Sequence, residues 1–230
     1  MGIATITTVL DLIGVFINGL LGGAVARKRD LDLFGYLSIG LVSGLGGGLI
    51  RDTLLQHGPP DALTNAFYIP TALVGGMLAF LLQFTEQDWN RVFYLLDAIA
   101  LSVWAITGAQ KTLDVGLGWL PALLLGTITA VGGGAVRDLL LQRVPAVFGG
   151  NALYASVALV VAGIQVACSG LGAPVAGTVA GVVTGTALRV IAYRRGWALP
   201  EGTTWEPRDV LGKVTRHDRR DPDHRPPNAE

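Results

Sequence analysis

Apolar segments long enough to cross a bilayer constrain this chain more than any other feature of its sequence. A helix needs about 20 predominantly apolar residues to cross about 30 Å of hydrocarbon, and lipid offers no hydrogen-bond partners to any other open backbone. Charged residues make up only 15% of the chain, and its mean hydropathy is +0.52. We therefore predict an all-α membrane protein with seven transmembrane helices, at about 5–26, 32–55, 66–84, 92–110, 119–141, 151–168 and 173–192.

The positions of Lys and Arg in the loops predict the orientation of these spans. Cytoplasmic loops of membrane proteins carry an excess of basic residues. With the N-terminus outside, the outer loops hold Lys111 and little else, and no basic residue precedes the first apolar run as it would in a signal peptide. We therefore expect the N-terminus outside and the C-terminus in the cytoplasm, with these basic residues on the cytoplasmic side: Arg27, Lys28, Arg29, Arg91, Arg143, Arg194 and Arg195.

The end of the chain differs sharply from the apolar part. Eight Lys or Arg and seven Asp or Glu follow Tyr193. A segment with so few apolar residues cannot bury enough surface to fold alone. We expect 196–230 to be a disordered cytoplasmic tail, and the basic residues beside the last span to contact anionic membrane lipid.

An internal duplication organises the apolar part. When the chain is shifted against itself by 86 residues, GLGGGLIRDTLLQ at 44–56 aligns with AVGGGAVRDLLLQ at 130–142, and no gap is needed from Asp11 to Pro59. Chance would not preserve charged, glycine and proline positions at one offset. The aligned pairs include Asp11 with Asp97, Gly22 with Gly108, Gly40 with Gly126, Pro59 with Pro145, and Tyr68 with Tyr154.

An odd number of spans in each repeat sets how the repeats lie in the membrane. We predict a three-helix repeat at 1–88 and a second at 89–170, which enters the bilayer from the opposite side. Inverted repeats of this kind build transport proteins with the solute path at the repeat interface. The seventh helix, at 171–195, lies outside the duplication. Its glycines recur every four residues and predict close helix packing, at Gly177, Gly181 and Gly185.

Each repeat carries three consecutive glycines inside a span. Glycine weakens a helix by about 1 kcal/mol relative to alanine, and loosened backbone in a membrane is tolerated only inside protein or beside a wet cavity. We therefore expect the second and fifth spans to bend or break at the glycines, with their carbonyl groups facing water. The residues concerned are Gly46, Gly47, Gly48, Gly132, Gly133 and Gly134.

An Arg-Asp pair follows each glycine triplet: Arg51 with Asp52, and Arg137 with Asp138. Charged residues within spans usually face the bundle interior or a water-filled cavity. Adjacent residues point about 100° apart on a helix, so we expect each charge to find a partner beyond its neighbour. The candidates include the other repeat and the intramembrane charges Asp11 and Asp97. Lys111 fits either an outer loop or the vestibule of a pore.

Catalytic and cofactor sites find no support in the sequence. GLGGGLI is not a P-loop pattern and follows an apolar helix rather than a strand. The three histidines lie in a loop or in the tail, and the single Cys168 excludes a multi-cysteine metal site. We expect no enzymatic activity, no cofactor, no metal site and no nucleic-acid partner.

The paired motifs resemble those of a known family. Two copies of GGGxxRD in three-helix repeats, followed by a seventh helix, resemble the bacterial members of the trimeric intracellular cation (TRIC) channel family, which are also classed as a glycine transporter-like domain family. The resemblance covers about residues 5–192. It implies a bacterial inner-membrane homotrimer in which each protomer has its own hourglass pore for K⁺ and Na⁺. It also implies that the glycine-broken second and fifth helices, with both motifs, line the pore.

Three functions remain open from the residues alone. In a cation channel, backbone carbonyls and the hydroxyls of Ser43, Thr127 and Thr129 replace part of an ion's hydration shell, and Asp52 and Asp138 favour cations. In a secondary transporter, half-helix ends hold a small solute such as glycine. In a membrane scaffold the glycines serve packing alone, and alanine at both Gly47 and Gly133 would then stabilise the protein.

Overall fold

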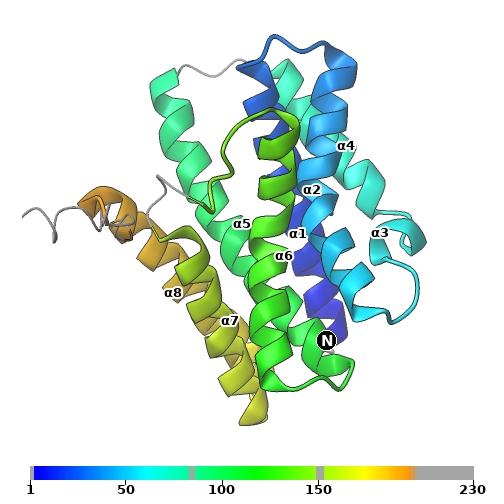
Figure 1. Ribbon diagram of the computed structural model, residues 1–230, viewed down its shortest axis with the longest axis vertical. Helices are drawn as coiled ribbons and strands as arrows, with labels where there is room; N and C mark the ends of the chain where they lie inside the picture. Colours follow the sequence, from blue (N-terminus) through cyan, green and yellow to red (C-terminus); the bar gives the residue numbers. More distant parts are fainter. Residues whose placement is uncertain (1–2, 83–85, 149–152, 198, 200–230) are drawn as a thin grey trace, which may run out of the picture. The chain divides into compact units, whose positions relative to one another are not determined.

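The computed structural model describes residues 3–82, 86–148, 153–197 and 199, and the described residues are helical with no strand. All helices belong to one unit within Met1–Ala198. Successive long helices along the chain run in alternating directions (Figure 1). In chain order the helices are α1 (Ile3–Arg27), α2 (Leu33–Leu55), α3 (Asp61–Thr64), α4 (Tyr68–Leu81), α5 (Glu86–Asp114), α6 (Trp119–Leu140), α7 (Tyr154–Gly170) and α8 (Pro174–Arg195).

A helix overlaps each of the seven predicted apolar segments, and the all-α prediction is confirmed over the described residues. Five helices are long and apolar enough to cross a membrane, namely α1, α2, α5, α6 and α8. The other two, α4 and α7, have 14 and 17 residues. At 1.5 Å per residue α4 extends over only about 21 Å. The predicted tail at 196–230 lies largely outside the described residues.

The expected break at the glycine triplets is wrong. Both α2 and α6 remain α-helical through their three glycines. The physical reason is that a broken helix leaves peptide groups unpaired in an apolar setting, and each costs more than the roughly 1 kcal/mol helix penalty of a glycine. The glycines instead allow α2 and α6 to cross at very short distance.

The crossing is reciprocal. A Cβ atom on Gly47 would lie within 3.0 Å of the carbonyl oxygen of Thr129, and one on Gly133 within 3.0 Å of that of Ser43. These two contacts are related by the 86-residue shift. A Cβ on Gly46 would lie 3.2 Å from the Cα of Gly133. The scaffold alternative, in which alanine at both Gly47 and Gly133 would stabilise the protein, is disfavoured by these distances, because each new methyl group would collide with backbone.

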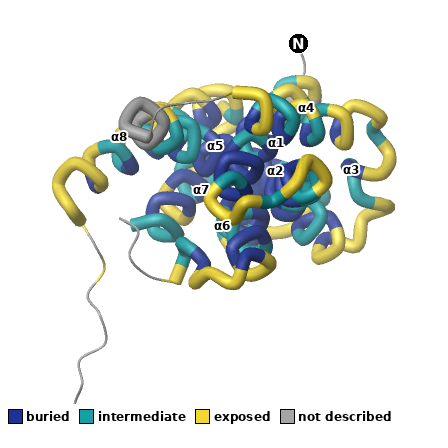
Figure 2. Tube along the Cα trace, turned by 90° about the horizontal axis from the view of Figure 1, so that it is seen from above, coloured by how far each residue is buried: buried dark blue, intermediate teal, exposed yellow. Residues whose placement is uncertain are grey.

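The outer and inner faces of the helices differ in burial. Buried residues face the middle of the bundle, while exposed residues lie around its outside (Figure 2). Many of the exposed side chains are large and apolar, such as Leu124 on α6 and Val183 on α8. This is the reverse of a soluble surface and matches a bundle surrounded by lipid or by other apolar helices.

The glycine stripe of α8 packs as predicted. A Cβ on Gly185 would meet Ser102 and Val161, and a Cβ on Gly181 would meet Ile106. The small residues thus bring α8 against α5 and α7. This packing places Arg189 of α8 close to Asp97 of α5.

Candidate functional site

A buried arginine near the end of α2 organises the first group of charges. Arg51 is 1% exposed. Its Nε lies 2.8 Å from Asp52 Oδ1, and its Nη1 and Nη2 lie 3.3 and 3.4 Å from Asp11 Oδ2 on α1. Tyr68, the first residue of α4, donates its hydroxyl to the same Asp11 oxygen at 3.2 Å. Helices α1, α2 and α4 therefore meet at one ion pair.

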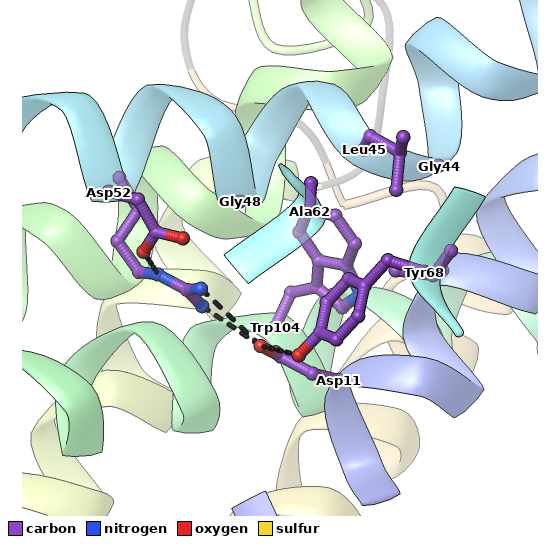
Figure 3. Close-up of a pocket in the computed structure, with 10 residues that line it drawn as sticks. Asp11, Gly44, Leu45, Gly48, Asp52, Ala62, Tyr68 and Trp104 are labelled. Carbon is purple, nitrogen blue, oxygen red and sulfur yellow. Dashed lines mark hydrogen bonds and ion pairs between the residues drawn. The ribbon is translucent and has the colours of Figure 1, made fainter. Parts of the chain in front are cut away.

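A small cavity lies beside this ion pair. Tyr68 and Asp11 point toward each other across it, with Gly48 and Asp52 on the neighbouring helix and Trp104 opposite (Figure 3). Its volume is about 10 Å³, which is room for roughly one water molecule. We call it the first cavity. The side chains around it nearly fill the space.

Lys111 of α5 and Asp61 of α3 extend this group of charges. Its Nζ lies 2.9 Å from Asp52 Oδ1 and 2.5 Å from Asp61 Oδ2. Asp61 begins the short helix α3, and its backbone N–H donates to Asp52 Oδ2 at 3.0 Å. Lys111 lies in the last turn of α5 and not in a loop. The first charge cluster is therefore Asp11, Arg51, Asp52, Asp61 and Lys111.

A related arrangement occurs at the end of α6. Arg137 Nε lies 3.0 Å from Asp138 Oδ1, and the backbone N–H of Ala146 donates to Asp138 Oδ2 at 3.2 Å. Tyr154, the first residue of α7, donates its hydroxyl to Asp97 Oδ1 on α5 at 3.1 Å. Each of these contacts has a counterpart in the first cluster, shifted by 85 or 86 residues.

The second group differs from the first in the partner of its remote carboxylate. Asp97 Oδ2 accepts a hydrogen bond from Arg189 Nη2 of α8 at 3.1 Å. The second charge cluster is therefore Asp97, Arg137, Asp138 and Arg189. The second cavity, beside this cluster, has a volume of about 190 Å³, and Tyr94, Arg143 and Tyr154 also line it.

The expectation that adjacent Arg and Asp do not pair is wrong for both motifs. The 100° separation applies to the directions in which the side chains leave the helix. An arginine is long enough for its Nε to turn back onto a neighbouring carboxylate, as the distances of 2.8 and 3.0 Å show. The suggested partner Asp11 is confirmed for Arg51. The two halves of the chain are linked by the ion pairs of Lys111 with Asp52 and Asp61.

Two predicted hydroxyls lie away from both cavities. Ser43 and Thr129 are fully buried at helix contacts, where Gly22 and Gly108 pack against them. Thr129 donates to the carbonyl oxygen of Leu125 within its own helix. Of the six motif glycines, Gly48 lines the first cavity, and Gly134 lies next to Arg137 and Tyr154.

Four residues in or beside the two clusters were not singled out as site residues from the sequence. Asp61 is in a loop-like stretch and gave no signal. Tyr68 and Tyr154 align in the duplication, and this pairing was a usable signal. Arg189 lies inside the predicted seventh span, where an intramembrane charge is a sign of function.

The two cavities are lined by opposite excess charge. One arginine and two carboxylates line the first cavity, whereas three arginines and two carboxylates line the second. Such groups can attract, hold or exclude small ions. In the described part of the chain, no group of three or more His, Cys, Asp or Glu side chains is arranged to hold a metal ion.

Comparison with protein families and curated proteins gives consistent matches. The family model described as "Glycine transporter" matches residues 8–83 and 94–170. A UPF0126 membrane protein of Deinococcus radiodurans is 39% identical over 155 residues, which cover 67% of this chain and 72% of that protein. The inner membrane protein YadS of Escherichia coli is 33% identical over 152 residues, which cover 66% of this chain and 73% of YadS.

Comparison with solved structures finds the same fold. A crystal structure of the TRIC trimeric intracellular cation channel orthologue from Rhodobacter sphaeroides superposes with a TM-score of 0.78 at 32% identity, covering 84% of this chain and 99% of that one. A structure from work on conductance through TRIC cation channels has a TM-score of 0.78 at 28% identity, covering 86% and 98%. The fold described above is thus similar to that of these membrane proteins.

Proposed function

The chain belongs to the family described as "Glycine transporter", whose solved structures are TRIC channels, and from this membership we propose that it is a channel for monovalent cations, K⁺ and Na⁺. The observation that carries the proposal is the pair of charge clusters inside an apolar bundle. Intramembrane charges are costly and mark ion pathways. Enzymatic chemistry has no comparable support in the described residues.

The proposed architecture has seven transmembrane helices in two inverted repeats. The repeats occupy 1–88 and 89–170, the seventh helix occupies 171–195, and 196–230 forms a cytoplasmic tail. The reciprocal glycine contacts between α2 and α6 support it. So do the matching hydrogen bonds from Tyr68 to Asp11 and from Tyr154 to Asp97.

The proposed pore runs within each protomer of a homotrimer. It follows α2 and α6 from the first cavity to the second, past the crossing of the glycine triplets. The close approach at Gly47 and Gly133 favours a closed state here, and conduction would require α2 and α6 to separate. The lining would include Gly48, Asp52, Gly134 and Asp138.

The proposed location is the inner membrane of a bacterium, as the names of the relatives suggest. With the N-terminus outside, the second cavity faces the cytoplasm, because Arg143 and the basic end of α8 lie on its side. The first cavity then faces outward. Anionic lipid would contact the basic residues at the cytoplasmic end of α8.

Current recording from purified protein in planar bilayers tests this function. We expect unitary, ohmic currents and a reversal potential in a KCl gradient that reports cation preference. The Asp138→Asn variant should reduce that preference, because a carboxylate beside the path attracts cations. Unitary currents carried mainly by chloride would refute the proposal.

A small-solute transporter is the second candidate. The second cavity, of about 190 Å³, combines guanidinium and carboxylate groups that can hold the carboxylate and the amine of a molecule such as glycine. Slow, saturable uptake of glycine into proteoliposomes without unitary currents would favour it. A membrane scaffold would give neither currents nor uptake.

Replacement of Lys111 tests whether its ion pairs help to keep the outer mouth of the proposed pore closed. Its ammonium joins Asp52, which lines the first cavity, to Asp61, and its side chain is 25% exposed. A partly exposed ion pair contributes on the order of 1 kcal/mol, so Lys111→Met should raise the open probability by about threefold or more. Lys28→Met, at the exposed end of α1, is the control and should leave gating unchanged. Unchanged gating in Lys111→Met would mean that this ion pair does not close the mouth.

A further inference from the structure

We propose that Arg189 of α8 is a positioning residue that holds the second cavity open by keeping Asp97 away from Arg137. Its effect on ion flux rests on the channel function proposed above, whereas its effect on the cavity does not. The inference starts from the partner of the remote carboxylate, Asp11 or Asp97, which differs between the two clusters.

The remote carboxylates have different partners. In the first cluster Asp11 binds both terminal nitrogens of Arg51, at 3.3 and 3.4 Å. Its counterpart Asp97 binds Arg189 instead, at 3.1 Å. The cavity beside the Arg51 pair holds about 10 Å³, and the cavity beside Arg137 about 190 Å³. The wider cavity thus coincides with the arginine that does not bind its remote carboxylate.

Arg189 is held firmly in place. It is fully buried, and its guanidinium carbon lies 5.0 Å from the ring centre of Tyr94 and 4.6 Å from that of Tyr154. The ring of Tyr94 stacks in turn on Tyr193 of α8, with the ring centres 3.8 Å apart. A guanidinium between two aromatic faces is stabilised by cation–π attraction. The seventh helix therefore fixes the charge that captures Asp97.

Arg137 is the alternative partner for Asp97. Arg137 Nη2 and the Tyr154 hydroxyl lie near the same point: a Cβ atom built on Gly134 would be 3.6 Å from the first and 3.9 Å from the second. That hydroxyl is already bonded to Asp97. Within the described residues the only ion pair of Arg137 is through its Nε to Asp138. Arg137 lines the second cavity, as Arg51 lines the first.

Removal of Arg189 should therefore close the second cavity. A buried carboxylate that loses its partner seeks another cation, and Arg137 lines the same cavity as Asp97. The resulting Asp97–Arg137 pair would repeat the Asp11–Arg51 pair of the first cluster. The seventh helix, which has no counterpart in the duplication, thus makes the two halves unequal.

Thiol accessibility tests the inference on the full chain. Ala146, which lines the second cavity, is replaced by Cys in a Cys168→Ser background, and its reaction rate with a charged methanethiosulfonate reagent is measured. We expect Arg189→Gln to slow this reaction about tenfold, as a shift of the cavity to a mostly closed population would do. Adding Asp97→Asn should restore the rate, because the closing pair can no longer form.

The control is Arg195→Gln on the same helix, which should change nothing, since Arg195 is exposed and contacts Trp197. An unchanged rate in folded Arg189→Gln protein, or a rate that Asp97→Asn does not restore, overturns the inference. If Arg189→Gln does not fold, Arg189→Lys takes its place. It should slow the reaction partly, with the same reversal by Asp97→Asn, and an unchanged rate again refutes the inference. Bilayer currents from the same variants test the consequence for conduction separately, because thiol rates need no ion flux.

Discussion

Alanine at Gly47 is expected to destabilise the protein by about 3 kcal/mol and to abolish ion flux. The added methyl group would lie within 3.0 Å of the carbonyl oxygen of Thr129 and of the ring of Trp104. Overpacking of a tight core costs about 1–3 kcal/mol and at times more, and here one colliding atom belongs to the backbone of α6. Unfolding of the purified protein in detergent, followed by tryptophan fluorescence, measures the change in stability.

The next glycine provides a matched control. A Cβ on Gly48 would meet nothing closer than Arg51 Nη2, at 3.8 Å. Gly48→Ala should therefore retain or gain stability, by up to about 1 kcal/mol from helix propensity. The corresponding pair in the other half is Gly133→Ala, which should destabilise, and Gly134→Ala, which should not. Equal effects at Gly47 and Gly48 would contradict the close crossing of α2 and α6.

Removal of the charge of Arg51 is expected to cost about 3–5 kcal/mol. Arg51→Met leaves Asp11 buried without its cation, and an unpaired buried charge is strongly destabilising. Asp52 suffers less, since Lys111 and the backbone N–H of Asp61 still bind it. The same unfolding measurement in detergent gives the size of the loss.

A double variant separates this effect from a general loss of packing. Arg51→Met with Asp11→Leu removes both charges, and apolar replacement of a buried ion pair is often close to neutral. We therefore expect the double variant to recover most of the stability. Arg143→Met, an exposed arginine at the second cavity, should stay within about 0.5 kcal/mol of the unsubstituted protein. A double variant as unstable as Arg51→Met would disprove the ion-pair explanation.

The sequence predicts the helices of this fold well, because apolar length is what lipid demands of a spanning segment. The predicted range 119–141 becomes α6, and 173–192 becomes α8. The short helix α3 was missed, since four residues carry no periodic signal. The duplication also predicts which residues have equivalent roles. Tyr68 and Tyr154 make the same kind of hydrogen bond to Asp11 and Asp97.

The tertiary partners could not be predicted in the same way. A glycine triplet is compatible with a broken helix or with a close crossing, and only the position of α6 decides between them. The self-pairing of Arg51 with Asp52 depends on a side-chain rotamer, which a helical wheel does not represent. The contact between Arg189 and Asp97 joins residues 92 positions apart. No periodic pattern links them.

The opposite excess charge of the two cavity linings has a consequence for the electrical behaviour of a pore between them. A mouth with an excess of carboxylates concentrates cations, and a mouth with an excess of guanidinium groups depletes them. In symmetric salt, a cation would therefore enter more readily from the side of Asp52 and Lys111 than from the side of Arg137 and Arg189. The current through such a pore would therefore rectify weakly. High salt would abolish this rectification, because it screens the charges at both mouths.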